Sequence, residues 1–286
     1  MSKYLVFLNI VFALQGNFLV DLIFFSFDRP MQLYALLEST EKFVSHHGKI
    51  HVICRSSNNS FLDAYKILEK RFNKVNFVYQ AESSEFKHLL MNLFNANNSD
   101  YICFGVDDII VKDYIDLSFC AIALKKYKNA YGFYLRLGKN IDYCYSENIG
   151  TPAPKMDISQ GLCLWKFADG KGDWNYPNTV DMTIYKKNEI LADIEKCPMS
   201  NPSNFENQWA VKADHNKYGI CFYKSKIVNI PLNVVDPNNT NRHMNNYSCN
   251  ELLEKFNCGY KIDINKLFRI DNRSPHFAFP IEFINR

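Results

Sequence analysis

The chain has 286 residues, of which 47% are hydrophobic and 22% charged, so it is long enough for one large α/β domain or two small ones with a sizeable core. Its 33 basic and 30 acidic residues give a formal net charge of +3 and form no basic block, which argues against a nucleic-acid partner. The nine cysteines include no C-x-x-C pair. Cys54 and Cys103 stand in apolar stretches, so we expect reduced, buried thiols rather than a disulfide framework.

Residues 1–17, MSKYLVFLNIVFALQGN, combine a short basic start with an apolar run and a small residue, Gly16, near its end. This pattern fits either a cleavable signal peptide or an N-terminal helix buried against the rest of the protein. The run is too short for an ordinary transmembrane span. The first alternative predicts export or membrane association, and the second predicts a cytoplasmic protein.

From residue 18 onward, apolar strands alternate with amphipathic helices. The predicted strands are FLVDLIFFSF (18–27), KIHVICRSS (49–57), VNFVYQ (75–80) and DYICFGVDD (100–108), and the predicted helices between them are 31–44, 61–72 and 85–96. Pro30 stands where the first helix begins. This alternation predicts an α/β protein with a Rossmann-like, mostly parallel central sheet that is flanked by helices.

The second half of the chain has a different pattern. Residues 109–127 are expected to form a loop and then a helix, 129–137 a strand, and 180–194 a strand followed by a helix, with a loop-rich stretch at 140–178. We predict a single domain over residues 18–286, with a first half at 18–125 and a loop-rich second half at 126–286.

Polar side chains follow the predicted strands at the points where the strands end, namely Ser26, Asp28, Arg29, Arg55, Asp107 and Asp108. Ligands of open α/β sheets bind beyond the carboxyl ends of the strands, so these side chains mark the expected site. Adjacent carboxylates suit Mg²⁺ or Mn²⁺, which complete their shells with diphosphate oxygens and water. The alternative for Asp107 and Asp108 is a solvated turn or a helix cap.

Basic side chains stand near the same strand ends. Arg29, Arg55 and Lys87 could neutralise a phosphate or hold a base edge. Neither G-x-G-x-x-G nor G-x-x-x-x-G-K-[ST] occurs, which argues against a nicotinamide oxidoreductase and a P-loop enzyme.

In this order and spacing, FFSFDRP, ICRSS, Lys87 and CFGVDD resemble the nucleotide-sugar-binding half of a GT-A fold glycosyltransferase of the family 2 type. The chain has V-D-D, with Val106 in the place of the first acid of the family's D-x-D motif. The resemblance implies that residues 18–125 bind the nucleotide and residues 126–286 form the acceptor half. It implies that Asp108 binds the Mn²⁺ or Mg²⁺ that bridges the diphosphate, and that Asp107 holds ribose or sugar hydroxyls. The nucleotide would be lined by Ser26, Asp28, Arg29, Arg55 and Lys87.

Three later stretches fit the same family pattern. TVDMTIYKKNEI resembles the segment under the donor sugar, which implies that Val180 and Asp181 face the site, although Met182 replaces the family's usual Gly or Ala. NPSNFENQWA resembles the region that supplies the catalytic carboxylate of inverting members, which implies that Glu206 is the base, with Asn207 in place of the usual second acid. His243 stands where many members have a late histidine that completes metal or phosphate binding.

Each of these residues also has a structural interpretation. Ser203 and Glu206 fit a capping box at a helix start, and His243 could be a surface or capping residue. Asp173, in GKGDWNYP, is the second candidate base. Its neighbour Trp174 could be a sugar platform or a buried loop anchor.

Two further side chains, His276 and Arg136, are not assigned to the site. His276 lies between Pro275 and aromatic residues and is expected to pack with the C-terminal tail. Arg136 would face the crevice if its strand is central, or form an ion pair if its strand is at an edge.

These patterns predict a metal-dependent glycosyltransferase that moves a sugar from a nucleotide-diphosphate donor to a hydroxyl of a glycan, lipid or protein acceptor. One alternative is a sugar-phosphate nucleotidyltransferase, although the Gly-rich N-terminal loop of such enzymes is absent. The other is a non-catalytic carbohydrate-binding or interaction module on the same fold.

Overall fold

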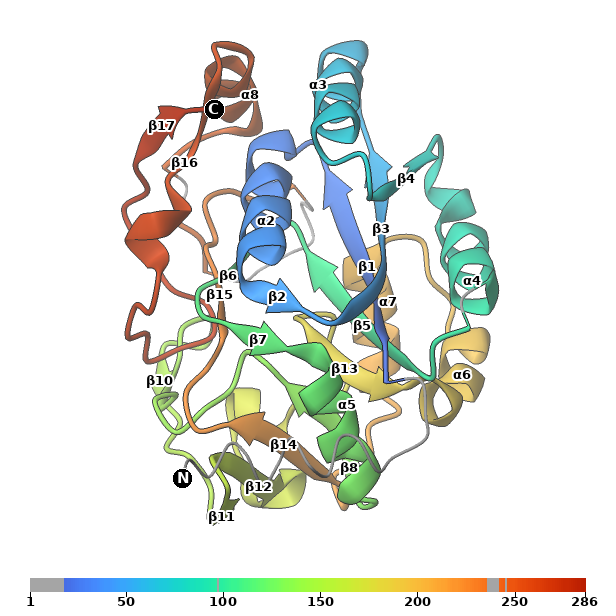
Figure 1. Cartoon of the computed structure of the whole chain (residues 1–286), viewed down its shortest axis with the longest axis vertical. Coiled ribbons are helices and arrows are strands. Elements are labelled where there is room, and N and C mark those ends of the chain that lie inside the picture. The colour runs from blue at the N-terminus through green and yellow to red at the C-terminus, as the bar shows by residue number, and fades with distance from the viewer. Residues whose placement is uncertain (1–17, 97, 236–241, 245) are drawn as a thin grey trace.

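In the computed structural model, strands from both halves of the chain form one nine-stranded sheet (Figure 1). The structure describes residues 18–96, 98–235, 242–244 and 246–286. The strands across the sheet are, in order, β11 (Asp157–Ser159), β12 (Leu162–Lys166), β14 (Tyr218–Phe222), β8 (Ala130–Tyr134), β13 (Thr183–Lys186), β5 (Tyr101–Val106), β1 (Val20–Phe27), β3 (His47–Arg55) and β4 (Asn76–Gln80).

Most strands of the sheet run in the same direction. The pairs β4 with β3, β3 with β1, β1 with β5 and β8 with β14 are parallel, whereas β13 opposes both of its neighbours, β5 and β8. β12 likewise opposes β14 and β11. The sheet is therefore mostly parallel, with two reversed strands.

The strand order locates the expected ligand crevice. The first four long strands are arranged as β4-β3-β1-β5, so the chain moves outward in one direction from β1 and then returns to place β5 on the other side of β1. In a doubly wound sheet, ligands bind at the point where this direction reverses. Phe25 of β1 pairs with Val106 of β5, so the carboxyl ends of the two strands lie side by side at this point.

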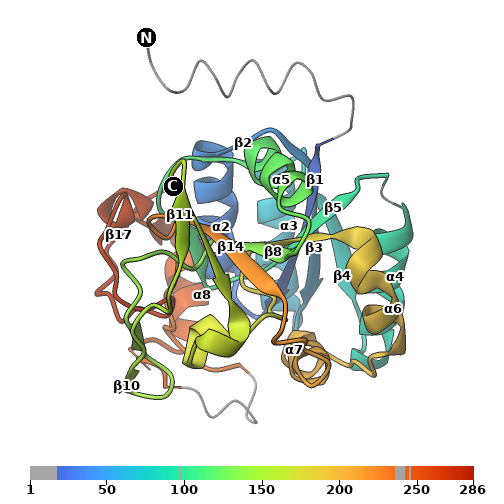
Figure 2. The same cartoon turned by 90° about the horizontal axis from the view of Figure 1, so that it is seen from below.

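Helices cover both faces of the sheet (Figure 2). One face packs against α2 (Pro30–Phe43), α3 (Asn59–Arg71), α5 (Leu117–Lys126) and α8 (Cys249–Asn257), and the other against α4 (Phe86–Ala96), α6 (Lys187–Lys196) and α7 (Pro202–Ala210). β1 contributes to both cores because successive side chains of a strand point to opposite faces: Leu22 and Phe24 to the first, Ile23 and Phe25 to the second. This explains why its sequence is apolar without alternation.

Short elements complete the structure. They are the strand pairs β2 (Val44–Ser45) with β7 (Ile115–Asp116), β6 (Ile109–Val111) with β15 (Ile227–Asn229), β9 (Tyr143–Cys144) with β10 (Ile149–Gly150) and β16 (Tyr260–Ile262) with β17 (Phe283–Asn285), and the 3₁₀ turns η1 (Ser83–Glu85), η2 (Phe167–Asp169), η3 (Gly172–Asn175) and η4 (Ile264–Leu267). The pairing of β6 with β15 matters for the site. It carries Asn229 to the strand end that holds Asp107 and Asp108, because Asn229 pairs with Ile109.

The predicted α/β class, with a mostly parallel central sheet between helices, is confirmed. The nine cysteines are free, and Cys54 and Cys103 are buried in their strands as expected. The predicted signal peptide or N-terminal helix lies outside the described residues. Within the part of the chain that the structure describes, no helix combines the length and apolar character needed to cross a membrane.

Candidate functional site

A polar cleft of about 360 Å³ opens where β1 and β5 end. Its walls come from segments far apart in the sequence. The predicted site residues that line it are Arg29, Asp108, Asp173, Val180, Asp181, Glu206 and His243. Arg136, Tyr176, Asn229 and His276 line it as well.

Asp107 lies beneath the cleft floor, with 4% of its surface exposed. Its carboxylate accepts hydrogen bonds from Ser26 Oγ at 2.9 Å and from the backbone N–H of Phe27 at 3.3 Å, and it pairs with Arg29 Nη1 at 3.0 Å. A buried carboxylate needs such partners because burial without them is very costly. Asp107 therefore joins the ends of β1 and β5.

Arg29 connects this corner to a distant loop. Its Nε donates to Asn233 Oδ1 at 2.9 Å and its Nη2 to the carbonyl of Asn233 at 2.5 Å. Burial works against the guanidinium charge, but the attraction of Asp107 and Asp108 outweighs it and raises the pKa of Arg29. Arg29 is thus a permanent cation that holds the 233 loop against the sheet while it also lines the cleft.

The second acid of the pair, Asp108, faces the cleft. Asn229 Nδ2 bridges Asp108 Oδ1, at 3.4 Å, and Asp181 Oδ1, at 3.1 Å. Burial, together with repulsion from Asp107 and Asp181, raises the pKa of Asp108 to about 6 although Arg29 opposes the shift. Two carboxylates thus converge on one amide, and their charge is only partly offset.

The donor set of this corner suits a hard divalent cation. Carboxylate and amide oxygens are the ligands that Mg²⁺ and Mn²⁺ prefer, and the Oδ1 atom of Asn229 is a buried acceptor without a hydrogen-bond partner. Among the described residues, no three His, Cys, Asp or Glu side chains are grouped closely enough to hold a metal by themselves. Such a cation would therefore need ligand oxygens, as Mg²⁺ does when it binds with a diphosphate.

Glu206, on α7, lines the cleft. Its Oε1 accepts a hydrogen bond from the backbone N–H of Val180 at 2.9 Å. Burial and repulsion from Asp181 raise the pKa of this half-buried carboxylate to about 7. The alternative prediction of a capping box from Ser203 to Glu206 is wrong, because α7 begins after Asn201, whose side chain accepts from the backbone N–H of Asn204.

Asp173 and Arg136, which both line the cleft, form an ion pair. Arg136 is 1% exposed, and its Nη2 also donates to the carbonyls of Asp173, at 3.2 Å, and of Tyr176, at 3.4 Å. Trp174 is fully buried and donates from Nε1 to the carbonyl of Ile141 at 3.3 Å. Of the two interpretations of Trp174, the loop anchor is therefore confirmed and the sugar platform is wrong.

Five predicted site residues do not line the cleft: Ser26, Asp28, Arg55, Lys87 and Asp107. Asp28 accepts from the backbone N–H of Ser57 at 2.8 Å, and Arg55 donates to Ser83 Oγ at 2.6 Å. Lys87 donates to the carbonyl of Glu195 at 2.7 Å, at the end of α6. The predicted nucleotide contacts of these residues stay predictions, and for Lys87 the observed partner lies away from the cleft lining.

Sequence reasoning did not assign Asn229 or Tyr176 to the site, and it expected His276 to pack with the C-terminal tail, whereas all three line the cleft. Asn229 and the tail segment pair through backbone hydrogen bonds, from Asn229 N to the Pro275 carbonyl and from Phe277 N to the Asn229 carbonyl, both at 2.9 Å. This pairing brings His276 to the Asp108 corner, where it opposes the rise in the pKa of Asp108. No local pattern signals such a contact, because the two segments are far apart in the sequence.

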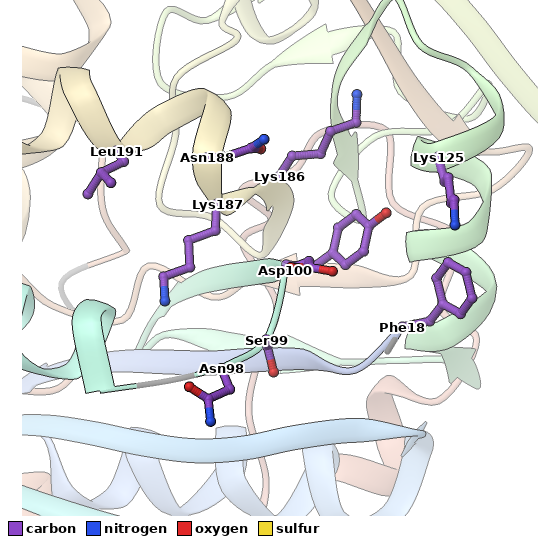
Figure 3. Close-up of a pocket in the computed structure, with 10 residues that line it drawn as sticks. Phe18, Asn98, Ser99, Asp100, Lys125, Lys186, Lys187, Asn188 and Leu191 are labelled. Atoms are coloured by element: carbon purple, nitrogen blue, oxygen red, sulfur yellow. The ribbon is translucent and has the colours of Figure 1, made fainter. Parts of the chain in front are cut away.

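A larger cavity of about 600 Å³ lies at the opposite edge of the sheet, beside the starts of β1 and β5. Figure 3 shows Lys187 and Leu191 on one side of it and Phe18 and Lys125 on the other. None of the predicted site residues lines this cavity. Since ligands of open α/β sheets bind at the carboxyl ends of the strands, the smaller cleft is the candidate site.

Comparison with known proteins gives one curated relative. No family model matches the chain. The chain is 31% identical over 189 residues, or 60% of its length, to the bifunctional glycosyltransferase pgtA of Dictyostelium discoideum. The alignment spans about a quarter, 24%, of the length of that protein.

Solved structures show weaker likeness. The crystal structure of S. aureus TarS 1-349 is 13% identical with a TM-score of 0.45, covering 73% of this chain and 59% of that one. The mannosyltransferase PcManGT from Pyrobaculum calidifontis, solved with GDP-Man and Mn²⁺, is 10% identical with a TM-score of 0.39, covering 70% of this chain and 53% of that one. The comparison that tests the motifs is the sequence match to the curated relative. The resemblance to glycosyltransferases that the motifs predict is confirmed by this sequence similarity, over the part of the chain that aligns.

Proposed function

We propose that this protein is a metal-dependent glycosyltransferase that moves a sugar from a nucleotide-diphosphate donor to an acceptor hydroxyl. The observation that carries the proposal is one cleft, at the reversal point of the sheet, that is lined by Asp108, Asp181, Glu206 and Asp173 and in which Asn229 joins Asp108 to Asp181. The sequence similarity to a curated glycosyltransferase supports the same class of reaction.

The donor would lie at the Asp108 end. Asp108 and Asp181 would hold Mn²⁺ or Mg²⁺ together with the diphosphate oxygens, with His243 and His276 beside them as further candidate ligands. When bound, the cation supplies positive charge that stabilises the departing diphosphate. Arg29 contributes a fixed cation to the same end, because Asp107 and Asn233 hold its guanidinium in place.

Glu206 is the proposed general base. A base works best when its pKa is close to the working pH, and burial and Asp181 raise the pKa of Glu206 to about 7. Hydrogen bonds from the Val180 N–H and the Thr179 side chain fix the position of the carboxylate. In this scheme, Glu206 takes the proton of the acceptor hydroxyl as that oxygen attacks the anomeric carbon, and the nucleoside diphosphate leaves with inversion of configuration.

Asp173 is less suited to this role. One oxygen of its carboxylate is already committed to the ion pair with the buried Arg136. We therefore assign the base to Glu206 and give Asp173 a binding role.

The proposal is tested by the stability of the protein with nucleotides. Melting temperatures are measured with each nucleoside diphosphate and nucleotide sugar, with and without Mn²⁺, because a ligand of the folded state stabilises it by about 2.7 kcal/mol at 100 times its dissociation constant. We expect one nucleotide to raise the melting temperature only with the metal, and its sugar adduct to be turned over. The absence of any metal-dependent shift would refute the proposal, and binding without turnover would favour a non-catalytic module.

A further inference from the structure

One part of the cleft is built on the η3 turn. Asp173 lies within this turn, Tyr176 directly follows it, and Arg136 follows β8; all three line the cleft. None of them contacts the Asp108 corner through a hydrogen bond or ion pair. These three residues therefore form a group separate from the proposed metal and diphosphate site.

Asp173 is held in a fixed orientation. Arg136 Nη1 pairs with Asp173 Oδ1, and Arg136 Nη2 reaches the carbonyls at both ends of the 173–176 segment. The guanidinium is buried, whereas the Asp173 side chain is 11% exposed. Because Arg136 engages only one of the two carboxylate oxygens, the other is free to accept a hydrogen bond from a ligand hydroxyl.

The turn that carries Asp173 is rigid. Gly172 has φ of +53°, a conformation that favours glycine, and a side chain there would meet Thr151 Cγ2 at 3.0 Å. On the other side of Asp173, the buried Trp174 accepts at its carbonyl from Trp165 Nε1 at 2.9 Å. Such anchoring lowers the entropy that a binding group loses when it engages a ligand.

Tyr176 adds a flat wall beside this carboxylate. The ring is half-buried, and the Arg136 guanidinium lies 5.8 Å from its centre. Burial, with repulsion from Glu206, raises the pKa of Tyr176, so the phenol stays neutral. A partly exposed aromatic face beside an oriented hydrogen-bond acceptor suits a saccharide ring, which has apolar C–H faces and hydroxyl edges.

The charge of the cleft decides which saccharides fit. Its two arginines are already paired, Arg29 with Asp107 and Arg136 with Asp173. The cleft also contains the carboxylates of Asp108, Glu147, Asp181 and Glu206, and its other ionisable cationic groups are His243 and His276. Even with a divalent cation beside Asp108, these four unpaired carboxylates leave the cleft with an excess of negative charge, which disfavours an anionic ligand.

We propose that Asp173, Tyr176 and the positioning residue Arg136 form a subsite for an uncharged pyranose, which packs on the Tyr176 ring and donates a hydroxyl to Asp173. If the proposed function holds, this pyranose is the acceptor sugar, since the proposed base Glu206 lines the same cleft and is close enough to Arg136 and Tyr176 for its charge to act on both. The acceptor is then a neutral glycan end. Uronic acids, sialic acids and phosphorylated acceptors are excluded by charge.

Saturation-transfer NMR on the full chain tests this subsite without a donor. The probes are the methyl glycosides of neutral hexoses and, as charge-matched controls, the corresponding uronic acids. We expect at least one neutral glycoside to bind at millimolar concentration and its uronic acid to bind at least about tenfold more weakly. Binding of the uronic acids as strong as that of the neutral glycosides, or binding of no neutral glycoside, would overturn the proposal.

Variants separate a binding role from a structural one. Tyr176→Ala should weaken binding of the neutral glycoside about tenfold, as expected for loss of an aromatic wall, whereas Tyr176→Phe should keep most of it. Asp173→Asn should weaken binding of the neutral glycoside and also reduce the difference in affinity between the neutral glycosides and the uronic acids. If Asp173 had a purely structural role, the variant would weaken the binding of both kinds of probe equally.

The exposed Tyr223, which lies outside the cleft lining, provides the matched control, Tyr223→Ala. It should bind the probes as the unaltered protein does, and melting curves identify variants that fail to fold. If the proposed function is wrong, the thermal experiment shows this separately, because no nucleotide then shifts the melting temperature. The NMR experiment needs no nucleotide and decides the subsite in either case.

Discussion

Replacement of Glu206 by glutamine tests the proposed base through two measurements, the turnover and the stability at alkaline pH, which should change in opposite directions. Glutamine keeps the shape of the side chain, and its Oε1 can still accept from the Val180 N–H. It cannot take a proton from an acceptor hydroxyl. We therefore expect kcat to fall by about 10²–10⁴ while the folded protein becomes more stable at alkaline pH.

The gain in stability follows from the pKa. Burial and Asp181 raise the pKa of Glu206 from 4.5 to about 7, so the folded state retains a proton that the unfolded state loses between these values. Stability therefore falls as the pH rises through this window, and the full penalty is present above pH 7. The pKa rises by about 2.5 units (7 − 4.5), and at about 1.4 kcal/mol for each unit the penalty is at most about 3.5 kcal/mol. Because water screens this half-buried carboxylate, we expect Glu206→Gln to gain about 1–2 kcal/mol.

The assays are urea unfolding at pH 5 and pH 8, and kcat/KM for the responsive donor from pH 5 to pH 9. The stability gain should be present at pH 8 and small at pH 5. In the unaltered protein kcat/KM should rise with pH with an apparent pKa of about 7, which belongs to Glu206 coupled to Asp181. A variant that is destabilised at pH 8, or one that keeps its turnover and pH profile, would refute the assignment.

Three further predictions address the corner residues and the η3 turn. Asp108→Asn should abolish the Mn²⁺-dependent shift in melting temperature that a nucleotide causes. Chelation of the metal should abolish the same shift in the unaltered protein. A nucleotide shift that persists in the variant and after chelation would show that Asp108 is not part of the site. Arg29→Ala should lose about 3–5 kcal/mol in urea unfolding, because it leaves the buried Asp107 without its cation. A loss below about 1 kcal/mol would show that Asp107 does not depend on the pair. Gly172→Ala should lower stability by about 1–2 kcal/mol, since alanine would need a positive φ and its Cβ would stand 3.0 Å from Thr151 Cγ2; an unchanged melting temperature would contradict the rigidity of the turn.

The first half of the fold could be predicted from the sequence because its signals are local. The runs of apolar residues and the helical spacing between them mark β1, β3, β4 and β5 and the helices that join them. The position of Asp107 and Asp108 at a strand end follows from the same patterns, and the general rule for such sheets places the crevice there. The chemical character of the site, adjacent acids with nearby cations, is likewise present in the printed sequence.

The division of roles between the two adjacent acids was decided only by the tertiary structure. Neighbouring residues at a strand end point to different sides, so Asp107 turns into the core to meet Ser26 and Arg29 while Asp108 faces the cleft. The pairing of Asn229 with the tail brings His276 to the same corner, and no local periodicity encodes it. Likewise, Arg136 forms a buried ion pair with Asp173, and no sequence pattern pairs these two residues. Local sequence determines strands and helices through short-range sterics and burial, whereas the ion pairs and shared hydrogen bonds of the site exist only once distant segments pack together.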